Sequence, residues 1–118
     1  MTSLIAIASY GKGTWAALAE LIKSADWQAV FIITDKFGME HFQKQDNIEF
    51  VEVDFSKNPE EIRDIVLSGL KGKISDFEVA YNMISGDGKT HMAVLSGVLS
   101  LGLGIRIVYS KEGKLYEL

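Results

Sequence analysis

The chain has 118 residues, of which 47% are hydrophobic and 24% charged, and this composition fits one globular domain and excludes a disordered or fibrous protein. It contains no cysteine, which excludes disulfides, thiolate metal sites and cysteine nucleophiles. The net charge of −4, with lysines and arginines scattered along the chain, argues against a protein that binds long nucleic acids, because such proteins usually carry a basic stripe.

Apolar segments of strand length alternate with segments of helical periodicity from the first residues onward. Met1 leads into the first apolar segment without a basic leader, and no apolar run reaches about 18 residues, so we expect a cytoplasmic protein without a membrane span. In chain order we predict strand 3–9, helix 14–24, strand 28–34, helix 38–45, strand 48–53, helix 58–69, strand 77–83, helix 88–101, strand 105–109 and strand 114–117.

The strands are apolar along most of their length, which is typical of strands covered by helices on both faces. Short connections between alternating strands and helices predict right-handed crossovers and a parallel sheet, and the last two strands form a hairpin. We therefore predict one α/β domain over 1–118, a Rossmann-like three-layer sandwich with an antiparallel C-terminal hairpin. If the strand order is 3-2-1-4-5, the sheet reverses direction between strands one and four, where open α/β sheets bind ligands.

The first loop at that reversal follows strand 3–9 and is rich in glycine. Glycines let a backbone approach a ligand closely, and the helix that follows presents N–H groups to an anion. The candidate ligand-binding residues of this loop are Ser9, Tyr10, Gly11, Lys12 and Gly13. The alternative is an ordinary strand-to-helix turn, which also favours glycine and serine.

The same loop matches a loose dinucleotide-binding pattern, Gly11-x-Gly13-x-x-Ala16. Asp35, at the end of the second strand, stands where that pattern places an acid that binds ribose. The first glycine comes later after the strand than the pattern prefers, and we expect no catalytic domain beside this one. Binding of a nicotinamide or mononucleotide cofactor therefore remains as an alternative.

The second loop follows strand 77–83 and leads into helix 88–101. Its sequence includes Gly-Lys-Thr, but a phosphate-binding P-loop needs a glycine where this chain has Met83, so we reject a nucleotide triphosphatase. Lys89 opposes the dipole of its helix, which favours a role in a site over a solvated surface position. The candidate ligand-binding residues here are Asn82, Ser85, Gly86, Gly88, Lys89 and Thr90.

Metal binding is not expected. His41 and His91 lie far apart in the sequence, and neither glycine-rich loop carries a pair of acids, although Asp87 is close to the second one. We expect His91 and Trp15 to have packing roles. No cofactor is predicted either.

The segment Asn82-Met-Ile-Ser-Gly-Asp-Gly-Lys-Thr-His-Met-Ala-Val-Leu95, followed by a helix and Gly104-Ile-Arg-Ile-Val108, resembles the signature of CARF (CRISPR-associated Rossmann-fold) domains. The loop after the first strand, Ser9–Lys12, resembles the other motif of that family. The order of elements matches over nearly the whole chain. The residues from Ser85 to Gly88 differ from the usual family pattern.

This resemblance implies a homodimer that binds a cyclic oligoadenylate, a second messenger of type III CRISPR defence, across its two-fold axis. Some members of the family cleave the ring without metal, by attack of a ribose 2′-hydroxyl on the adjacent phosphate. The residues that would matter for such a ring nuclease resemble Ser9 and Lys89 by position. Three possibilities stay open: a sensor or sink for the messenger, a ring nuclease, and a regulatory domain that binds NAD(P) or a mononucleotide.

Helix 88–101 supports the expectation of a homodimer independently of the resemblance. Its apolar residues are spread almost all the way round, which exceeds what one face against a sheet requires. The surplus predicts a second copy of the chain, and the alternative is a neighbouring helix of the same chain. The apolar residues are Met92, Ala93, Val94, Leu95, Val98, Leu99 and Leu101.

Overall fold

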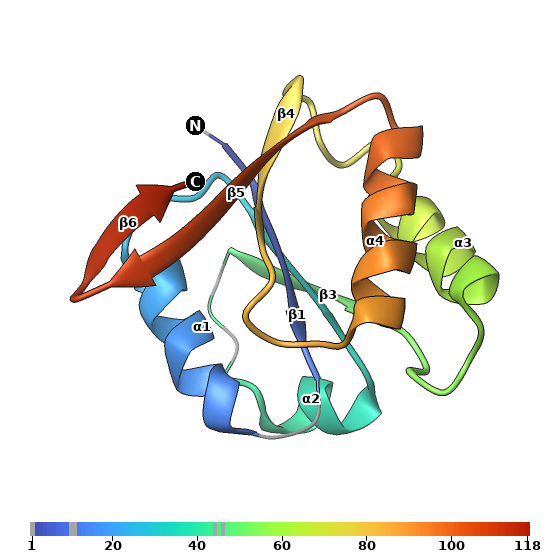
Figure 1. Cartoon of the computed structure of the whole chain (residues 1–118), viewed down its shortest axis with the longest axis horizontal. Coiled ribbons are helices and arrows are strands. Elements are labelled where there is room, and N and C mark those ends of the chain that lie inside the picture. The colour runs from blue at the N-terminus through green and yellow to red at the C-terminus, as the bar shows by residue number, and fades with distance from the viewer. Residues whose placement is uncertain (1, 10–11, 44, 46) are drawn as a thin grey trace.

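A computed structural model describes residues 2–9, 12–43, 45 and 47–118, and Figure 1 shows its helices and strands. Every strand and helix expected from the sequence is present, with ends shifted by a few residues. The elements are β1 (Leu4–Ala8), a 3-10 turn η1 (Lys12–Thr14), α1 (Trp15–Lys23), β2 (Val30–Thr34), α2 (Lys36–His41), β3 (Ile48–Glu52), α3 (Pro59–Leu70), β4 (Glu78–Asn82), α4 (Gly88–Ser100), β5 (Gly104–Lys111) and β6 (Lys114–Glu117).

The largest difference from the sequence-based prediction concerns α2, which was expected over 38–45. It begins at Lys36 because the Asp35 side chain accepts a hydrogen bond from the amide of Gly38 (2.8 Å) and so caps the helix. Gly38 is required there, since a Cβ at this position would lie 1.7 Å from Oγ1 of Thr34 on β2.

The six strands form one sheet in the order β3-β2-β1-β4-β5-β6. β1 pairs in parallel with β2 on one side and with β4 on the other, so that Leu4 faces Val30 and Ala80. β5 and β6 pair antiparallel. The predicted reversal between the first and fourth strands is therefore confirmed, and the loops after β1 and β4 leave the same edge of the sheet side by side.

The core lies in two layers, one on each face of the sheet, and β1 shows why. Its residues are fully buried, and they alternate between the two layers because successive side chains of a strand point to opposite faces. Leu4 and Ala6 pack in the layer that contains Leu18 of α1. Ile5 and Ile7 pack in the layer that contains the apolar residues of α3 and α4. The three-layer α/β architecture is confirmed.

Much of the apolar surface of α4 is covered within the chain, because α3 lies alongside it (Figure 1). Val94 and Val98 are buried, and a Cβ at Gly97 would lie 3.4 Å from the carbonyl oxygen of Arg63 on α3. Met92 and Leu99, by contrast, are 59% and 60% exposed. α3 thus covers part of the apolar surface of α4 that does not face the sheet, and it leaves the large side chains of Met92 and Leu99 uncovered.

No helix in the described part of the chain combines the length and the hydrophobicity needed to cross a membrane.

Candidate functional site

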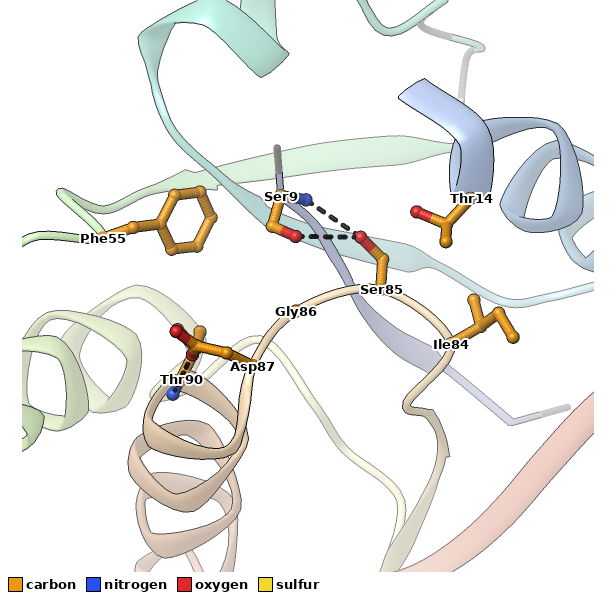
Figure 2. Close-up of a pocket in the computed structure, with 8 residues that line it drawn as sticks. All are labelled: Ser9, Thr14, Phe55, Ile84, Ser85, Gly86, Asp87 and Thr90. Atoms are coloured by element: carbon orange, nitrogen blue, oxygen red, sulfur yellow. Dashed lines mark hydrogen bonds between the residues drawn. The ribbon is translucent and has the colours of Figure 1, made fainter. Parts of the chain in front are cut away.

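A cavity of about 390 Å³ opens where the loops after β1 and β4 meet, at the carboxyl edge of the sheet (Figure 2). Its wall combines the end of β1, the start of α1, the loop between β3 and α3, and the loop that leads into α4. The lining residues are Ser9, Thr14, Phe55, Ile84, Ser85, Gly86, Asp87 and Thr90. The cavity lies at the position that the strand reversal predicts for a ligand.

Two serines connect the two loops at this cavity. Oγ of Ser85 accepts a hydrogen bond from the amide of Ser9 (3.1 Å) and lies 3.1 Å from Oγ of Ser9 (Figure 2). Ser85 is 3% exposed, so this contact is shielded from water. The carbonyl of Ser9 also accepts a hydrogen bond from the indole nitrogen of Trp15 (3.0 Å). The structure therefore brings together Ser9 and Ser85, which the sequence had singled out separately.

The hydroxyl of Thr14 has no hydrogen-bond partner, and it is the only buried side-chain polar atom in that condition among the residues that the structure describes. Figure 2 shows this oxygen pointing into the cavity toward Ser85. Thr14 is also the N-cap residue of α1, and its side chain makes no capping bond. The N-caps of the other three helices, Asp35, Asn58 and Asp87, each accept a capping bond.

Behind the second loop, a buried histidine fixes the backbone. Nε2 of His91 lies 2.7 Å from the carbonyl oxygen of Ser85, which can only accept, so Nε2 carries the proton. In the neutral ring Nδ1 then accepts from the hydroxyl of Tyr81 (2.9 Å). Burial lowers the pKa of His91 and raises the pKa of Tyr81, which keeps both groups uncharged.

Gly86 fits between this histidine and the sheet. Its φ of +106° lies in a region that favours glycine, and a Cβ would lie 3.0 Å from Nε2 of His91 and 3.2 Å from the side chain of Ile7. The expected packing role of His91 is confirmed, and it explains why the loop carries glycine here.

Asp87 and Thr90 define the rim of the cavity where α4 begins. The carboxylate of Asp87 accepts a hydrogen bond from the amide of Thr90 (2.9 Å), and the contacts with Thr90 hold the pKa of Asp87 below its ordinary value. Gly88 is the first residue of the helix. The rim therefore carries an ionised carboxylate directly before a helix N-terminus.

Asn82 is buried next to the cavity without lining it. Its side-chain nitrogen donates to the carbonyl oxygen of Val108 on β5 (2.8 Å), and its side-chain oxygen accepts from the amide of Ile84 (3.1 Å). These bonds attach the second loop to the neighbouring strand. A contact between Asn82 and a base or ribose stays a prediction.

Lys89, which the sequence placed in the site, lies outside the cavity lining. Its ammonium nitrogen donates to the backbone carbonyl oxygens of Phe55 (2.7 Å) and Lys57 (2.8 Å). The positive charge of Lys89 opposes the dipole of its helix, and these two bonds to carbonyl oxygens compensate for that unfavourable position. A direct role of Lys89 in catalysis stays a prediction.

The remaining predicted residues belong to the first loop. Tyr10 and Gly11 lie outside the described residues, while Lys12 and Gly13 belong to the 3-10 turn before α1.

Asp35, the candidate ribose-binding acid, uses one carboxylate oxygen to cap α2. Within the described part of the chain, no cluster of three or more histidines and acids could hold a metal ion.

Sequence reasoning missed four residues of the cavity as ligand contacts: Thr14, Phe55, Ile84 and Asp87. Thr14 looked like an ordinary helix start, and only its missing partner in three dimensions distinguishes it. Phe55 follows the third strand, at a distance along the chain from either glycine-rich loop, and no sequence signal indicated it.

Comparison with known proteins gives a likeness of fold. The chain is similar to a solved structure described as protein VC1899 from Vibrio cholerae, with a TM-score of 0.64 and 16% sequence identity. The match covers 98% of this chain and 33% of VC1899, so the chain spans about a third of the length of that protein. No protein-family model and no curated protein matches the sequence. The likeness shows a shared Rossmann-like α/β fold.

Proposed function

We propose that the chain binds a cyclic oligoadenylate, the ligand implied by its resemblance to CARF domains, in the cavity between the loops after β1 and β4. The observation that carries this proposal is the hydroxyl of Thr14, at the junction of η1 and α1. Thr14 makes no capping bond and directs this unpartnered hydroxyl into the cavity. A buried polar group without a partner is costly, so such a group is well explained by a ligand that supplies the partner.

The chemistry of the wall supports a nucleotide. The N-terminus of a helix carries a partial positive charge and donor groups, which favour a phosphate. The hydroxyl of Thr14 and one hydroxyl of the Ser9–Ser85 pair can donate to phosphate oxygens or contact ribose, and Phe55 and Ile84 offer apolar surface to a base. The rim carboxylate of Asp87 disfavours phosphate on the α4 side, so the phosphate belongs near α1.

A symmetric dimer fits this ligand. The cavity of about 390 Å³ is at the small end of the range of ligand pockets, so a ring of several nucleotides requires more than one such cavity. Two copies of the chain related by a two-fold axis would supply two. Exposed apolar side chains next to the cavity and on α4 offer the contact surface, namely Met83, Ile84, Met92 and Leu99.

The test is a thermal-shift and calorimetry panel of cyclic tetra-adenylate, cyclic hexa-adenylate, NAD, NADPH and ATP. We expect a cyclic oligoadenylate to bind most tightly. Thr14→Val should weaken that binding about tenfold through one lost hydrogen bond, and should leave the free protein at least as stable, since it removes an unpartnered hydroxyl. Thr2→Val, the same substitution before β1 and outside this cavity, is the control.

Two outcomes would contradict the proposal. Preferential binding of a nicotinamide nucleotide or ATP would favour the alternative of a regulatory nucleotide-binding domain. Equal affinity of Thr14→Val and the wild type would remove the start of α1 from the site. Incubating the ring with the protein in EDTA and analysing the products separates a ring nuclease, which yields a 2′,3′-cyclic phosphate or 3′-phosphate end, from a sensor or sink, which leaves the ring intact.

A further inference from the structure

The two hydrogen bonds of Lys89 join the start of α4 to the loop between β3 and α3. Lys89 lies in the first turn of α4, where a positive charge opposes the helix dipole. Its ammonium nitrogen donates to the carbonyl oxygens of Phe55 (2.7 Å) and Lys57 (2.8 Å), and we call this pair of bonds the Lys89 bridge. β3, which precedes these two residues, is an edge strand separated from β4 by β2 and β1. The bridge therefore ties the loop that leaves this edge strand to the start of α4, beside the packing of α3 on α4.

The bridged loop, residues 53–58, has an internal structure that suits this contact. The amide of Val53 donates to the carbonyl of Thr34 at the end of β2 (2.8 Å). The carboxylate of Asp54 accepts from the amide (2.9 Å) and the hydroxyl (2.6 Å) of Ser56, and the amide of Lys57 donates to the carbonyl of Asp54 (3.1 Å). These bonds shape the loop locally, and the Lys89 bridge adds its connection to α4.

Phe55 makes this connection relevant to the cavity. Its carbonyl accepts one of the two bonds of the bridge, while its side chain forms one side of the cavity, where Figure 2 shows the ring. The other end of the bridge is held firmly, because Asp87 caps α4 and His91 binds the carbonyl of Ser85. Phe55 also packs in the core layer under α3 and α4, and Lys89 adds an anchor for its backbone relative to Ser85.

We propose that Lys89 is a positioning residue that holds Phe55 as a wall of the cavity, and that it affects ligand recognition through Phe55 and not by contact of its ammonium group with the ligand. The effect on the ligand rests on the proposed function. The effect on the wall belongs to the free protein, so the two can be tested separately.

The first test is hydrogen–deuterium exchange of the free protein. Lys89→Met keeps the aliphatic stem and removes the donor, so the amides of residues 54–58 should exchange about tenfold faster while those of β2 stay unchanged. Lys89→Arg, which can still donate to two carbonyls, should restore most of the protection. Lys71→Met, an exposed lysine at the end of α3, is the matched control and should change nothing. Unchanged exchange at 54–58 in Lys89→Met would overturn the proposal.

The second test is a double-mutant cycle with cyclic tetra-adenylate as the probe. Lys89→Met should weaken binding about tenfold in the wild-type background and less than twofold in a Phe55→Leu background, because the two residues would act as one unit. The same tenfold loss in both backgrounds would mean that Lys89 contacts the ligand directly, and it would overturn the proposal. If the wild type does not bind the ring, the proposed function fails, and the exchange result alone decides the role of Lys89.

Discussion

At the scale of single residues, the polar groups around the cavity fall into two kinds. Asn82, Lys89 and His91 form hydrogen bonds with the backbone of the protein and so fix the loops, and His91 also accepts from the hydroxyl of Tyr81. Ser9, Thr14 and Ser85 direct hydroxyls at the cavity, and Thr14 has no partner at all. The first kind maintains the shape of the site. In the second kind the hydroxyls of Ser9 and Ser85 are bonded to each other, and the hydroxyl of Thr14 is the one left for a ligand among the residues that the structure describes.

His91 makes the stability of this arrangement depend on pH. Its pKa is lowered by burial, so between the lowered value and the ordinary 6.5 the unfolded chain binds a proton that the folded chain does not. The stabilisation is complete above pH 6.5 and is lost as the pH falls through the pKa of the folded state, by at most about 1.4 kcal/mol per pH unit. Urea unfolding at pH 5 to 8 should show a steeper loss for the wild type than for His91→Gln.

The control for this measurement is His41→Gln. His41 is exposed; its Nδ1 lies 2.8 Å from the carbonyl oxygen of Phe37, and its ring stacks on the Phe37 ring. This variant should follow the wild-type pH dependence. Parallel curves for the wild type and His91→Gln would show that protonation of His91 does not limit stability.

At the scale of secondary-structure elements, helix caps determine where the site begins. α3 starts at Pro59 because Asn58 accepts from the amide of Glu61 (2.9 Å), and α4 starts at Gly88 because Asp87 accepts from the amide of Thr90 (2.9 Å). α1 lacks such a bond at Thr14. Thr14 instead has helical dihedrals (φ −92°, ψ −9°) and ends the 3-10 turn η1 that runs into α1, so its side chain is not used as a cap.

Removing the capping side chain should lower the free energy of unfolding by a similar amount at α3 and at α4. We expect Asn58→Ala and Asp87→Ala each to lower the free energy of unfolding by about 1 kcal/mol, because each leaves one helix amide without its acceptor. Asp87→Asn should retain most of the stability, since an amide oxygen can accept the same bond. Urea denaturation at pH 7 measures all three, and a loss in Asp87→Asn equal to that in Asp87→Ala would contradict the capping role.

At the scale of the whole molecule, the two faces of α4 have different surroundings. One face is buried against the sheet and α3, where Val94 and Val98 are inaccessible to solvent. The other carries Met92 and Leu99, each about 60% exposed and seven residues apart, which places them on one side of the helix. Large apolar side chains aligned in this way are typical of a contact surface, and the predicted partner is a second copy of the chain.

The prediction is a homodimer that dissociates when this side of α4 becomes charged. The double variant Met92→Glu/Leu99→Glu should sediment as a monomer at a concentration at which the wild type is a dimer, because burying two carboxylates in an apolar contact is unfavourable. Ile65→Glu changes an exposed apolar residue of α3 (43% exposed) and should leave the dimer intact. A wild type that is already monomeric at micromolar concentration would contradict the prediction.

The sequence by itself determined the order of the elements, the parallel sheet and the edge at which the cavity lies. These features follow from local rules, namely apolar periodicity, short crossovers and the handedness of the connections. Ser9 and Ser85 could be predicted because each follows a strand whose neighbours in the sheet were foreseeable. The glycine-rich composition of both loops was a local signal of the same kind.

The tertiary structure alone decided which polar groups remain available to a ligand. Lys89 binds carbonyls more than 30 residues away, Asn82 binds a carbonyl 26 residues away, and Phe55 joins the cavity from the far side of the sheet. An ammonium or amide group can donate its hydrogen bonds equally well to a backbone carbonyl or to a ligand, and the residue type does not show which of these two acceptors it has in the protein. The outcome depends on which partners the completed fold brings within hydrogen-bonding distance, and among the residues that the structure describes the Thr14 hydroxyl is the buried side-chain group for which it brings none.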